Sequence, residues 1–311
     1  MVRFDLIGVP IGMGGGHHGT REAPVALRDA GLVSMLLSDG HQVRDLGDVD
    51  VDHVDRTEQA EGAIDQGILE ATTRACHQAR RLTMDSIQSG GFPITIGGDH
   101  SLAAGSLAGI AAARRLQDRD APGLLWFDAH ADLNTAETTP TGNLHGMSGA
   151  ALLGWKVPGL SEVVGTDGIY HRHQAAFLAP RDMDAGEQRH MDSGQMLHVT
   201  HDHIKSDGVV HSVGKATERA TAGTSSFALS FDVDVIDPSD APGVDTAVHG
   251  GPKLDVVLDA VRQISSHDGL IGVDVVEFNP INDRDDMTLG STIEVIRMIA
   301  HSITERASGR S

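Results

Sequence analysis

The 311-residue sequence has little cysteine, little positive charge and no long apolar run. Its single cysteine, Cys76, excludes an internal disulfide framework and is typical of a protein from a reducing cytoplasm. No run approaches the roughly 18 apolar residues that a membrane span needs. The start, Met1 to Pro10, is too short an apolar stretch, and too broken by Asp5, for a signal peptide. We therefore expect a cytoplasmic protein without a membrane partner.

Basic residues are scarce, because 24 Lys and Arg stand against 44 Asp and Glu and give a formal net charge of -20. Phosphate binding needs a basic face, so this balance argues against nucleic acid as a partner. A cationic substrate would instead be attracted. A solubility surface is the simpler explanation of this charge, and adaptation to a saline habitat is an alternative origin of it.

Strand-like apolar runs alternate along the chain with segments of helical spacing. The predicted strands are Val2 to Val9, Phe92 to Ile96, Leu124 to Phe127, Phe227 to Phe231 and Leu270 to Val276. The predicted helices are Ala23 to Leu37, Glu58 to Ser89, Ser101 to Gln117 with Ser101 as its cap, Lys253 to Ile264 and Ser291 to Arg306. Polar segments at Thr135 to Asn143 and Pro158 to Gly208 are expected to be loops. This alternation predicts an α/β fold, a single three-layer α/β/α domain over residues 1–311 with a mainly parallel central sheet.

Three short runs of acids and histidines stand at the ends of predicted strands. They are Gly97-Gly98-Asp99-His100, Asp128-Ala129-His130-Ala131-Asp132 and Ser230-Phe231-Asp232-Val233-Asp234. One such run alone is commonly a turn, but the carboxyl ends of parallel strands meet at one edge of a sheet, where ligands bind. Burying several aspartates there without a cation would be very costly.

The ligand types narrow the choice of metal. Carboxylate and imidazole without thiolate suit manganese or magnesium, and two histidines with four aspartates favour manganese. Six ligands are too many for one ion with an open position, but they suit two ions that share carboxylates, roughly 3.5–4 Å apart. The candidate ligands are His100, Asp128, His130, Asp132, Asp232 and Asp234.

The three runs, with Asp237-Pro238 after the third, resemble the signature segments of the ureohydrolase superfamily, manganese enzymes that release urea from guanidino compounds. The resemblance extends from Ile7-Gly8-Val9-Pro10 to Glu277-Phe278-Asn279-Pro280. It implies an arginase-like fold and two Mn²⁺ ions. One ion would be held by His100, Asp128, Asp132 and Asp232, and the other by His130, Asp128, Asp232 and Asp234.

The loop from Asp132 to Gly146 is similar to the arginase form rather than the agmatinase form. The resemblance implies that Asn134, Thr141 and Asn143 hold the α-carboxylate of an amino acid. The stretch from Arg181 to Glu187 is also arginase-like, which implies that its acids meet the α-amino group. The predicted substrate contacts are Asn134, Thr141, Asn143, Asp184, Glu187 and Thr246. Asp245 and Ala247 stand where arginases commonly carry glycine and proline, and an extra acid there could alter the preferred guanidino compound.

These groups predict hydrolysis of arginine to urea and ornithine by a hydroxide shared between the two ions. Glu277 would pair with the guanidinium, Asp132 would carry a proton to the leaving amine, and His145 would exchange protons with solvent. The family resemblance also suggests a homo-oligomer, a trimer or a hexamer.

Three other functions compete with this prediction. A ureohydrolase for N-hydroxyarginine, guanidinobutyrate or agmatine would keep every metal ligand. A zinc-dependent, deacetylase-like amidase is disfavoured by the second aspartate of the runs. An inactive metal-bound sensor of an amino acid is disfavoured by the intact His145 and Glu277.

Overall fold

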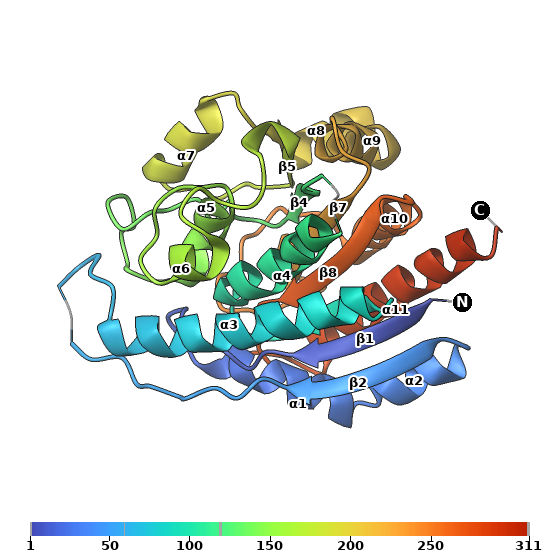
Figure 1. Cartoon of the computed structure of the whole chain (residues 1–311), viewed down its shortest axis with the longest axis horizontal. Helices are drawn as coiled ribbons and strands as arrows, with labels where there is room; N and C mark the ends of the chain where they lie inside the picture. The colour runs from blue at the N-terminus through green and yellow to red at the C-terminus, as the bar shows by residue number, and fades with distance from the viewer. Residues whose placement is uncertain (1, 59, 118–119, 310–311) are drawn as a thin grey trace.

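The computed structural model describes residues 2–58, 60–117 and 120–309, and its described part contains one eight-stranded sheet (Figure 1). All paired strands are parallel. The strand order is β2-β1-β3-β8-β7-β4-β5-β6. This architecture confirms the predicted parallel α/β fold. The strands are β1 (Arg3–Gly8), β2 (Gln42–Asp48), β3 (Phe92–Ile96), β4 (Gly123–Phe127), β5 (Ala175–Leu178), β6 (Leu197–Val199), β7 (Phe227–Asp232) and β8 (Leu270–Val276).

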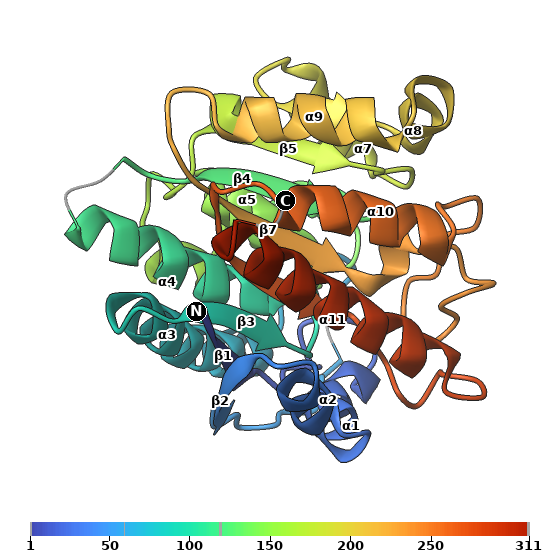
Figure 2. The ribbon, with the colours of Figure 1, turned by 90° about the vertical axis from the view of Figure 1, so that its right-hand side faces the viewer.

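Helices cover both faces of the sheet, and Figure 2 shows α3 and α4 on the side opposite α10 and α11. One buried cluster takes its helical residues from α1 (Ala23–Asp29), α2 (Leu32–Ser38), α8 (His201–Asp207), α9 (Val209–Ala220), α10 (Leu254–Ser265) and α11 (Met287–Ala307). The other takes them from α3 (Gln66–Gln88), α4 (Ala103–Leu116), α5 (Ser148–Leu152), α6 (Leu160–Val164) and α7 (Ala185–Asp192).

Strand residues divide between the two clusters by alternation. On β4, Leu125 and Phe127 belong to the first cluster, whereas Leu124 and Trp126 belong to the second. Successive side chains of a strand point to opposite faces, so a strand covered on both sides is apolar throughout. This explains why the central strands were visible in the sequence as continuous apolar runs.

Four helix predictions need correction, and one of them is the helix predicted from Ser291, which begins one turn earlier, at Met287. The predicted helix from Ala23 to Leu37 is two helices, α1 and α2, because Gly31 adopts a left-handed φ of 88° between them. The predicted helix from Glu58 begins later, at Gln66, and Gln59 lies outside the described residues. Ser101 does not cap α4. It lies inside a 3₁₀ turn, His100–Leu102, that is capped by the preceding Asp99.

The sequence also failed to indicate β2, β5 and β6. β2 is an edge strand whose side chains are largely exposed, so it lacks an apolar run. β5 and β6 are short, with 4 and 3 residues. The segment from Pro158 to Gly208, predicted as loop, therefore contains α6, β5, α7, β6 and α8. The segment from Thr135 to Asn143 does lack regular structure, as predicted.

The strand order places the carboxyl ends of four strands side by side. β3, β8, β7 and β4 are consecutive neighbours in the sheet, although they are far apart in sequence. Gly97 and Gly98 let the chain turn sharply after β3, with φ of 76° and 84°. A Cβ on Gly98 would lie 2.2 Å from the Val9 carbonyl oxygen, so only glycine fits. The Gly98 carbonyl accepts a hydrogen bond of 3.0 Å from the Glu277 backbone N–H, which ties the end of β3 to the end of β8.

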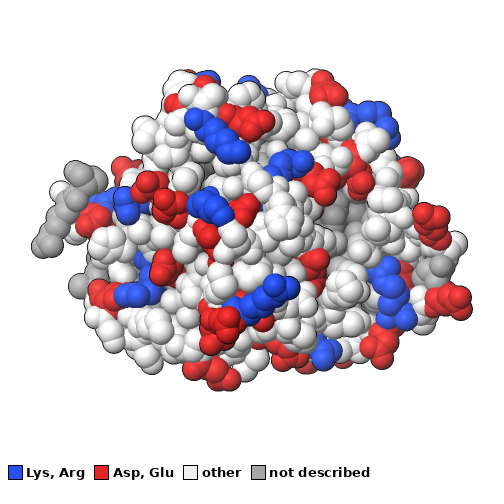
Figure 3. Space-filling view, turned by 180° about the vertical axis from the view of Figure 1, so that it is seen from behind, with Lys and Arg blue, Asp and Glu red and all other residues white. Residues whose placement is uncertain are grey.

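On the face shown in Figure 3, basic side chains lie singly among acidic ones rather than in a basic patch. None of the described helices is long and apolar enough to cross a bilayer.

The start of α3 provides a test of stability. Asp65 accepts hydrogen bonds from the backbone N–H groups of Gly67, Ile68 and Thr57, and from the Thr57 hydroxyl. We expect Asp65→Ala to lower the free energy of unfolding by about 1–2 kcal/mol, as loss of an N-cap does. Urea denaturation of the two proteins measures this difference.

The acid dependence separates capping from charge. The Thr57 hydroxyl and the backbone donors lower the pKa of Asp65, so its ionised form stabilises the fold. This contribution is complete above about pH 4 and is lost as the pH falls below the ordinary aspartate pKa. Asp65→Asn should keep much of the cap and lose the acid dependence. Equal stability of all three proteins at pH 7 would contradict the assignment.

Candidate metal centre and substrate pocket

All six candidate metal ligands meet at the carboxyl edge of the sheet. His100 follows β3, Asp128 and the two later ligands of its run follow β4, and Asp232 closes β7. The ligands are buried, except that 21% of the His130 side chain is exposed. Asp132 has a left-handed φ of 51°, which bends the chain after β4.

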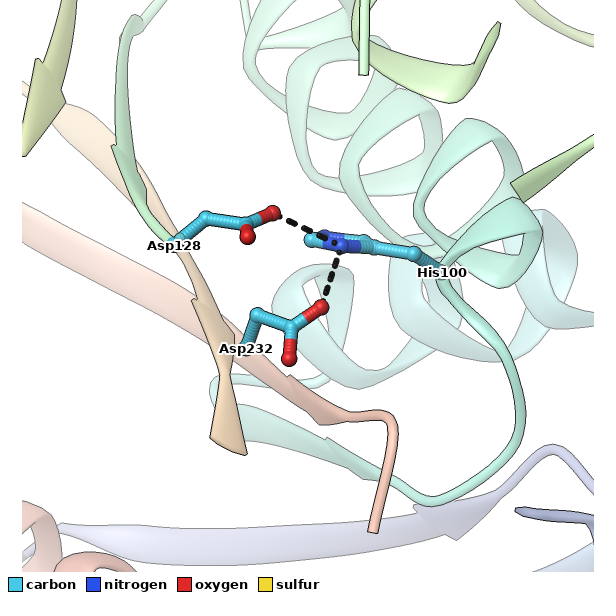
Figure 4. A group of neighbouring side chains, drawn as sticks. All are labelled: His100, Asp128 and Asp232. Atoms are coloured by element: carbon cyan, nitrogen blue, oxygen red, sulfur yellow. Dashed lines mark ion pairs between the residues drawn. The ribbon is translucent and has the colours of Figure 1, made fainter. Parts of the chain in front are cut away.

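His100 faces three carboxylates. Its Nδ1 lies 3.2 Å from Asp128 Oδ2, 2.9 Å from Asp132 Oδ2 and 2.9 Å from Asp232 Oδ2. Figure 4 shows the imidazole with Asp128 and Asp232 converging on it. The Nδ1 atom is buried and has no hydrogen bond to any described residue. The four side chains are therefore arranged around one common point.

A hydrogen-bond chain behind His100 sets its tautomer. The Ser230 hydroxyl donates to Asp274 Oδ1 at 2.5 Å, so its hydrogen is already used. His100 Nε2, 2.8 Å from the Ser230 oxygen, must then be the donor of that contact. The remaining nitrogen, Nδ1, turns its lone pair toward the carboxylates. This is the orientation of a metal-binding histidine held by an outer hydrogen bond.

Trp126 contacts both His100 and Asp128 and holds them in place. Its ring stacks on the His100 imidazole at 4.2 Å and 7°. Its Nε1–H donates to Asp128 Oδ2 at 2.9 Å. Both side chains are therefore held before any cation arrives.

A second group forms around His130. Its Nδ1 lies 3.0 Å from Asp234 Oδ2 and 3.5 Å from Asp128 Oδ1. Asp128 belongs to both groups, because one of its oxygens faces each histidine. The groups that could hold a metal ion are thus His100 with Asp128 and Asp232, and Asp128 with His130 and Asp234.

The donor set fits divalent cations. Burial raises the pKa of Asp232 well above its ordinary value, and the charges of Asp234 and Asp128 add to this effect. A cluster of this kind would take up protons unless cations balanced it. Oxygen and nitrogen ligands without thiolate suit manganese.

A cleft of about 180 Å³ opens over the ligands. His145 and Glu277 line it, and no lysine or arginine does so among the described residues. All six predicted substrate contacts also line it: Asn134, Thr141, Asn143, Asp184, Glu187 and Thr246. The structure therefore brings the two sets of predicted residues, metal ligands and substrate contacts, to one place.

Glu277 presents one free oxygen. Its backbone has a left-handed φ of 65°. Its Oε1 accepts hydrogen bonds from the His100 backbone N–H at 2.7 Å and from His145 Nδ1 at 2.9 Å. Its Oε2 is buried and has no partner among the described residues. An unpaired buried carboxylate oxygen in a cleft favours a cationic ligand that can donate to it.

His145 holds a proton beside this carboxylate. Burial lowers the pKa of His145, but the Glu277 charge and hydrogen bond outweigh burial and raise the pKa to about 9. Burial raises the pKa of Glu277, while His145 opposes that rise. With 16% of its side chain exposed, His145 also has access to solvent.

The predicted amino-acid contacts are linked to one another. Asn134 Nδ2 donates to Asp184 Oδ2 at 2.8 Å. The oxygens of Glu187 accept hydrogen bonds from the backbone N–H groups of Leu133 and Asp184, and burial raises the pKa of Glu187 to about 7. Thr246 differs from the others, because its hydroxyl donates to Asp234 Oδ2 at 3.0 Å and so contacts a candidate metal ligand.

Three residues of the site were not assigned from the sequence, namely Trp126, Ser230 and Asp274. Ser230 stood inside one of the three runs without a role. Asp274 is a fully buried charge in the apolar strand β8, where alternation and burial leave no place for an unpaired acid. An acid in the middle of this apolar strand was therefore the feature of the sequence that could have identified Asp274 as part of the site.

Comparison with known proteins agrees with this geometry. The model of the Arginase family matches residues 2–302. The arginase of Bacillus caldovelox is 32% identical over 298 residues, 95% of this chain and 97% of the relative. The solved structure of arginase from that organism matches with a TM-score of 0.89 at 31% identity, and the match covers 96% of this chain and 98% of the arginase chain. The structure of an Entamoeba histolytica arginase in complex with L-ornithine matches with a TM-score of 0.86 at 26% identity. This match covers 96% of this chain and 98% of the Entamoeba chain.

The fold, the site and these matches define a hydrolase that acts on guanidino or amidino groups. The chain belongs to the arginase family. Its His and Asp clusters are able to hold metal ions, as expected in a metal-dependent family.

The hydrogen-bond chain behind His100 can be tested through metal affinity. Ser230→Ala removes the acceptor of His100 Nε2–H and frees the tautomer. We expect manganese affinity to fall about 10- to 100-fold, as it does when an outer partner of a metal-bound histidine is lost. Titration calorimetry with Mn²⁺ measures this. Ser302→Ala, which removes a buried hydroxyl on α11, is the control and should bind like the unaltered protein. Unchanged affinity of Ser230→Ala would rule out the role.

Proposed function

We propose that this chain hydrolyses the guanidino group of L-arginine to urea and L-ornithine with two manganese ions. The observation that carries the proposal is the free Oε2 of Glu277 in a cleft that is also lined by four of the candidate ligands, His130, Asp132, Asp232 and Asp234. A guanidinium is a flat cation with several N–H donors and suits a carboxylate oxygen of this kind. The arginase relatives, one of them in complex with L-ornithine, support the proposal.

The metal ligands would be divided as the family resemblance implies. One ion would take His100 and Asp132, the other His130 and Asp234, and both would share Asp128 and Asp232. When bound, the ions would lower the pKa of a shared water so that hydroxide is available near neutral pH.

The side chains of the cleft would do the rest. Glu277 would hold the guanidinium through Oε2 while Oε1 stays bonded to His100 and His145. Asp132 would carry a proton to the leaving amine. His145 would keep its own proton on Nδ1 against Glu277 and exchange protons with solvent at its exposed edge.

The far end of the cleft favours an amino acid over a simple guanidino amine. Asn134, Thr141 and Asn143 offer amide and hydroxyl groups for a carboxylate, and Asp184 with Glu187 offers acids for an amino group. Asp245, the extra acid noted in the sequence, is not among the residues that line this cleft. It lines a neighbouring hollow, where Asn279 and Asn282 donate to its Oδ1.

We also propose a cytoplasmic homo-oligomer, a trimer or a hexamer. A free, buried Cys76 supports a reducing location. Light scattering of the purified protein determines the oligomeric state.

A parallel assay of substrates tests the reaction. We expect urea release by the manganese-loaded protein to be fastest from L-arginine and slower from N-hydroxyarginine, agmatine and guanidinobutyrate. Asp128→Ala should lose activity, because it removes a ligand common to both metal groups. A faster rate with agmatine would contradict the proposal, because it would show that the preferred substrate has no carboxylate. No release from any of the four would favour the amino-acid sensor.

Glu277→Gln tests the guanidinium contact. Gln keeps the size of the side chain but loses the charge opposite the guanidinium, an interaction whose loss in a buried setting costs about 3–5 kcal/mol. We expect kcat/KM for L-arginine to fall by at least about 100-fold. Manganese content should stay at that of the unaltered protein, because Glu277 is not a candidate ligand. Full activity, or loss of metal in parallel with activity, would contradict this role.

A further inference from the structure

A second hollow adjoins the candidate substrate cleft. The two share Pro140, Thr141 and Asn143 in their walls, so this short segment separates them. The opposite wall of the second hollow comes from the segment between β2 and α3, which includes Arg56. Residues far apart in sequence therefore meet at the end of the cleft proposed for the substrate's carboxylate.

Arg56 contacts that end directly. Its Nη2 donates to the Asn143 side-chain oxygen at 2.6 Å and to the Gly15 carbonyl at 3.4 Å. Among the described residues, Arg56 is the one lysine or arginine whose side chain is hydrogen-bonded to the segment 134–143. No role was assigned to it from the sequence.

The contact decides which end of the Asn143 amide is available. A carboxylate only accepts hydrogen bonds, so it needs the Nδ2 group and is repelled by the oxygen. Because Arg56 engages the oxygen, Nδ2 is left as the free end of the amide. Arg56 thus orients Asn143 as a donor.

Charge gives Arg56 a second effect. Two of the acids that line the cleft, Asp184 and Glu187, are neither candidate metal ligands nor paired with His145, and no lysine or arginine lines the cleft among the described residues. A substrate carboxylate entering this field is disfavoured unless positive charge lies near it. Arg56, which is bonded to Asn143, places a positive charge beside this end of the cleft.

The backbone next to Arg56 is tied down. The N–H and hydroxyl of its neighbour Thr57 donate to Asp65 at 2.9 and 2.5 Å. On the other side, Arg74 bonds Asp52 at 2.9 Å. The segment therefore has one bonded residue on each side of Arg56, whose own side chain is exposed.

From these contacts we infer that Arg56 is a positioning and specificity residue for the carboxylate end of the substrate. It makes the cleft prefer guanidino acids to guanidino amines of similar length. This inference rests on the proposed function, because it deepens the assignment of the same cleft.

Kinetics with two substrates test the inference. For Arg56→Ala we expect the KM for L-arginine to rise about tenfold, the size of a lost charged hydrogen bond, with kcat within about twofold. The kinetic constants for agmatine, which has no carboxylate, should not change. A general structural defect would instead lower kcat for both substrates. Equal effects on arginine and agmatine, or none on arginine, would overturn the inference.

Three further variants sharpen the test. Arg74→Ala removes one positive charge and one tie of the same segment without touching Asn143, so it should behave like the unaltered protein. Arg56→Lys keeps the charge, so its KM for L-arginine should lie between those of Arg56→Ala and the unaltered protein. Arg56→Gln keeps a donor but no charge, so its KM should lie closer to that of Arg56→Ala. An Arg74→Ala effect as large as that of Arg56→Ala would show that segment mobility, rather than the contact, is responsible.

Binding without turnover separates this inference from the proposed reaction. Calorimetry with L-ornithine and with putrescine, which lacks the carboxylate, does not depend on catalysis. Arg56→Ala should lower the affinity for ornithine about tenfold and leave the affinity for putrescine unchanged. This result would support the inference even if arginine were not hydrolysed. Failure of the unaltered protein to bind ornithine, or equal binding by both proteins, would overturn it.

Discussion

The structure depends on one electrostatic constraint, the collection of four aspartates and two histidines at the buried edge of a parallel sheet. Four carboxylates at this depth repel one another, and burial together with the charges of Asp234 and Asp128 raises the pKa of Asp232 well above its ordinary value. Such a cluster is stable only if cations or protons balance it. The sheet order makes the cluster possible, because β3, β8, β7 and β4 are consecutive and deliver their ends to one place. Fold and metal chemistry are therefore not separate properties of this chain.

The groups that hold the ligands come from strands rather than from loops. Ser230 lies on β7, Asp274 on β8 and Trp126 on β4, and each is bonded or stacked against His100 or its hydrogen-bond chain. Strand residues buried on both faces move little, so the imidazole and carboxylates are oriented before a cation binds. The cost is backbone strain at the strand ends, where Asp132 and Glu277 have positive φ.

The sequence was most informative where burial is two-sided. The central strands β3, β4, β7 and β8 are largely apolar runs, and the candidate ligands stand at or soon after the ends of β3, β4 and β7, so both could be predicted. Edge strand β2 and the short β5 and β6 could not, because exposed or brief strands leave no such pattern. The break at Gly31 was missed because a glycine within a helical pattern is tolerated as often as it ends a helix. Strand order was also out of reach, since neighbours in the sheet are distant in sequence, and with it the bond from Ser230 to Asp274.

The two ends of the cleft are built differently, and this difference has a consequence for specificity. The metal end is fixed by the sheet core, where one changed residue disturbs a connected network of buried hydrogen bonds. The proposed carboxylate end is formed by the segment 134–143, which lies outside the regular elements and is bonded through Asn143 to Arg56, between β2 and α3. A substitution there alters the field and the donors that meet the substrate without altering the ligands. A chain of this architecture can therefore change the acid it accepts through its loops while the hydrolytic end stays intact.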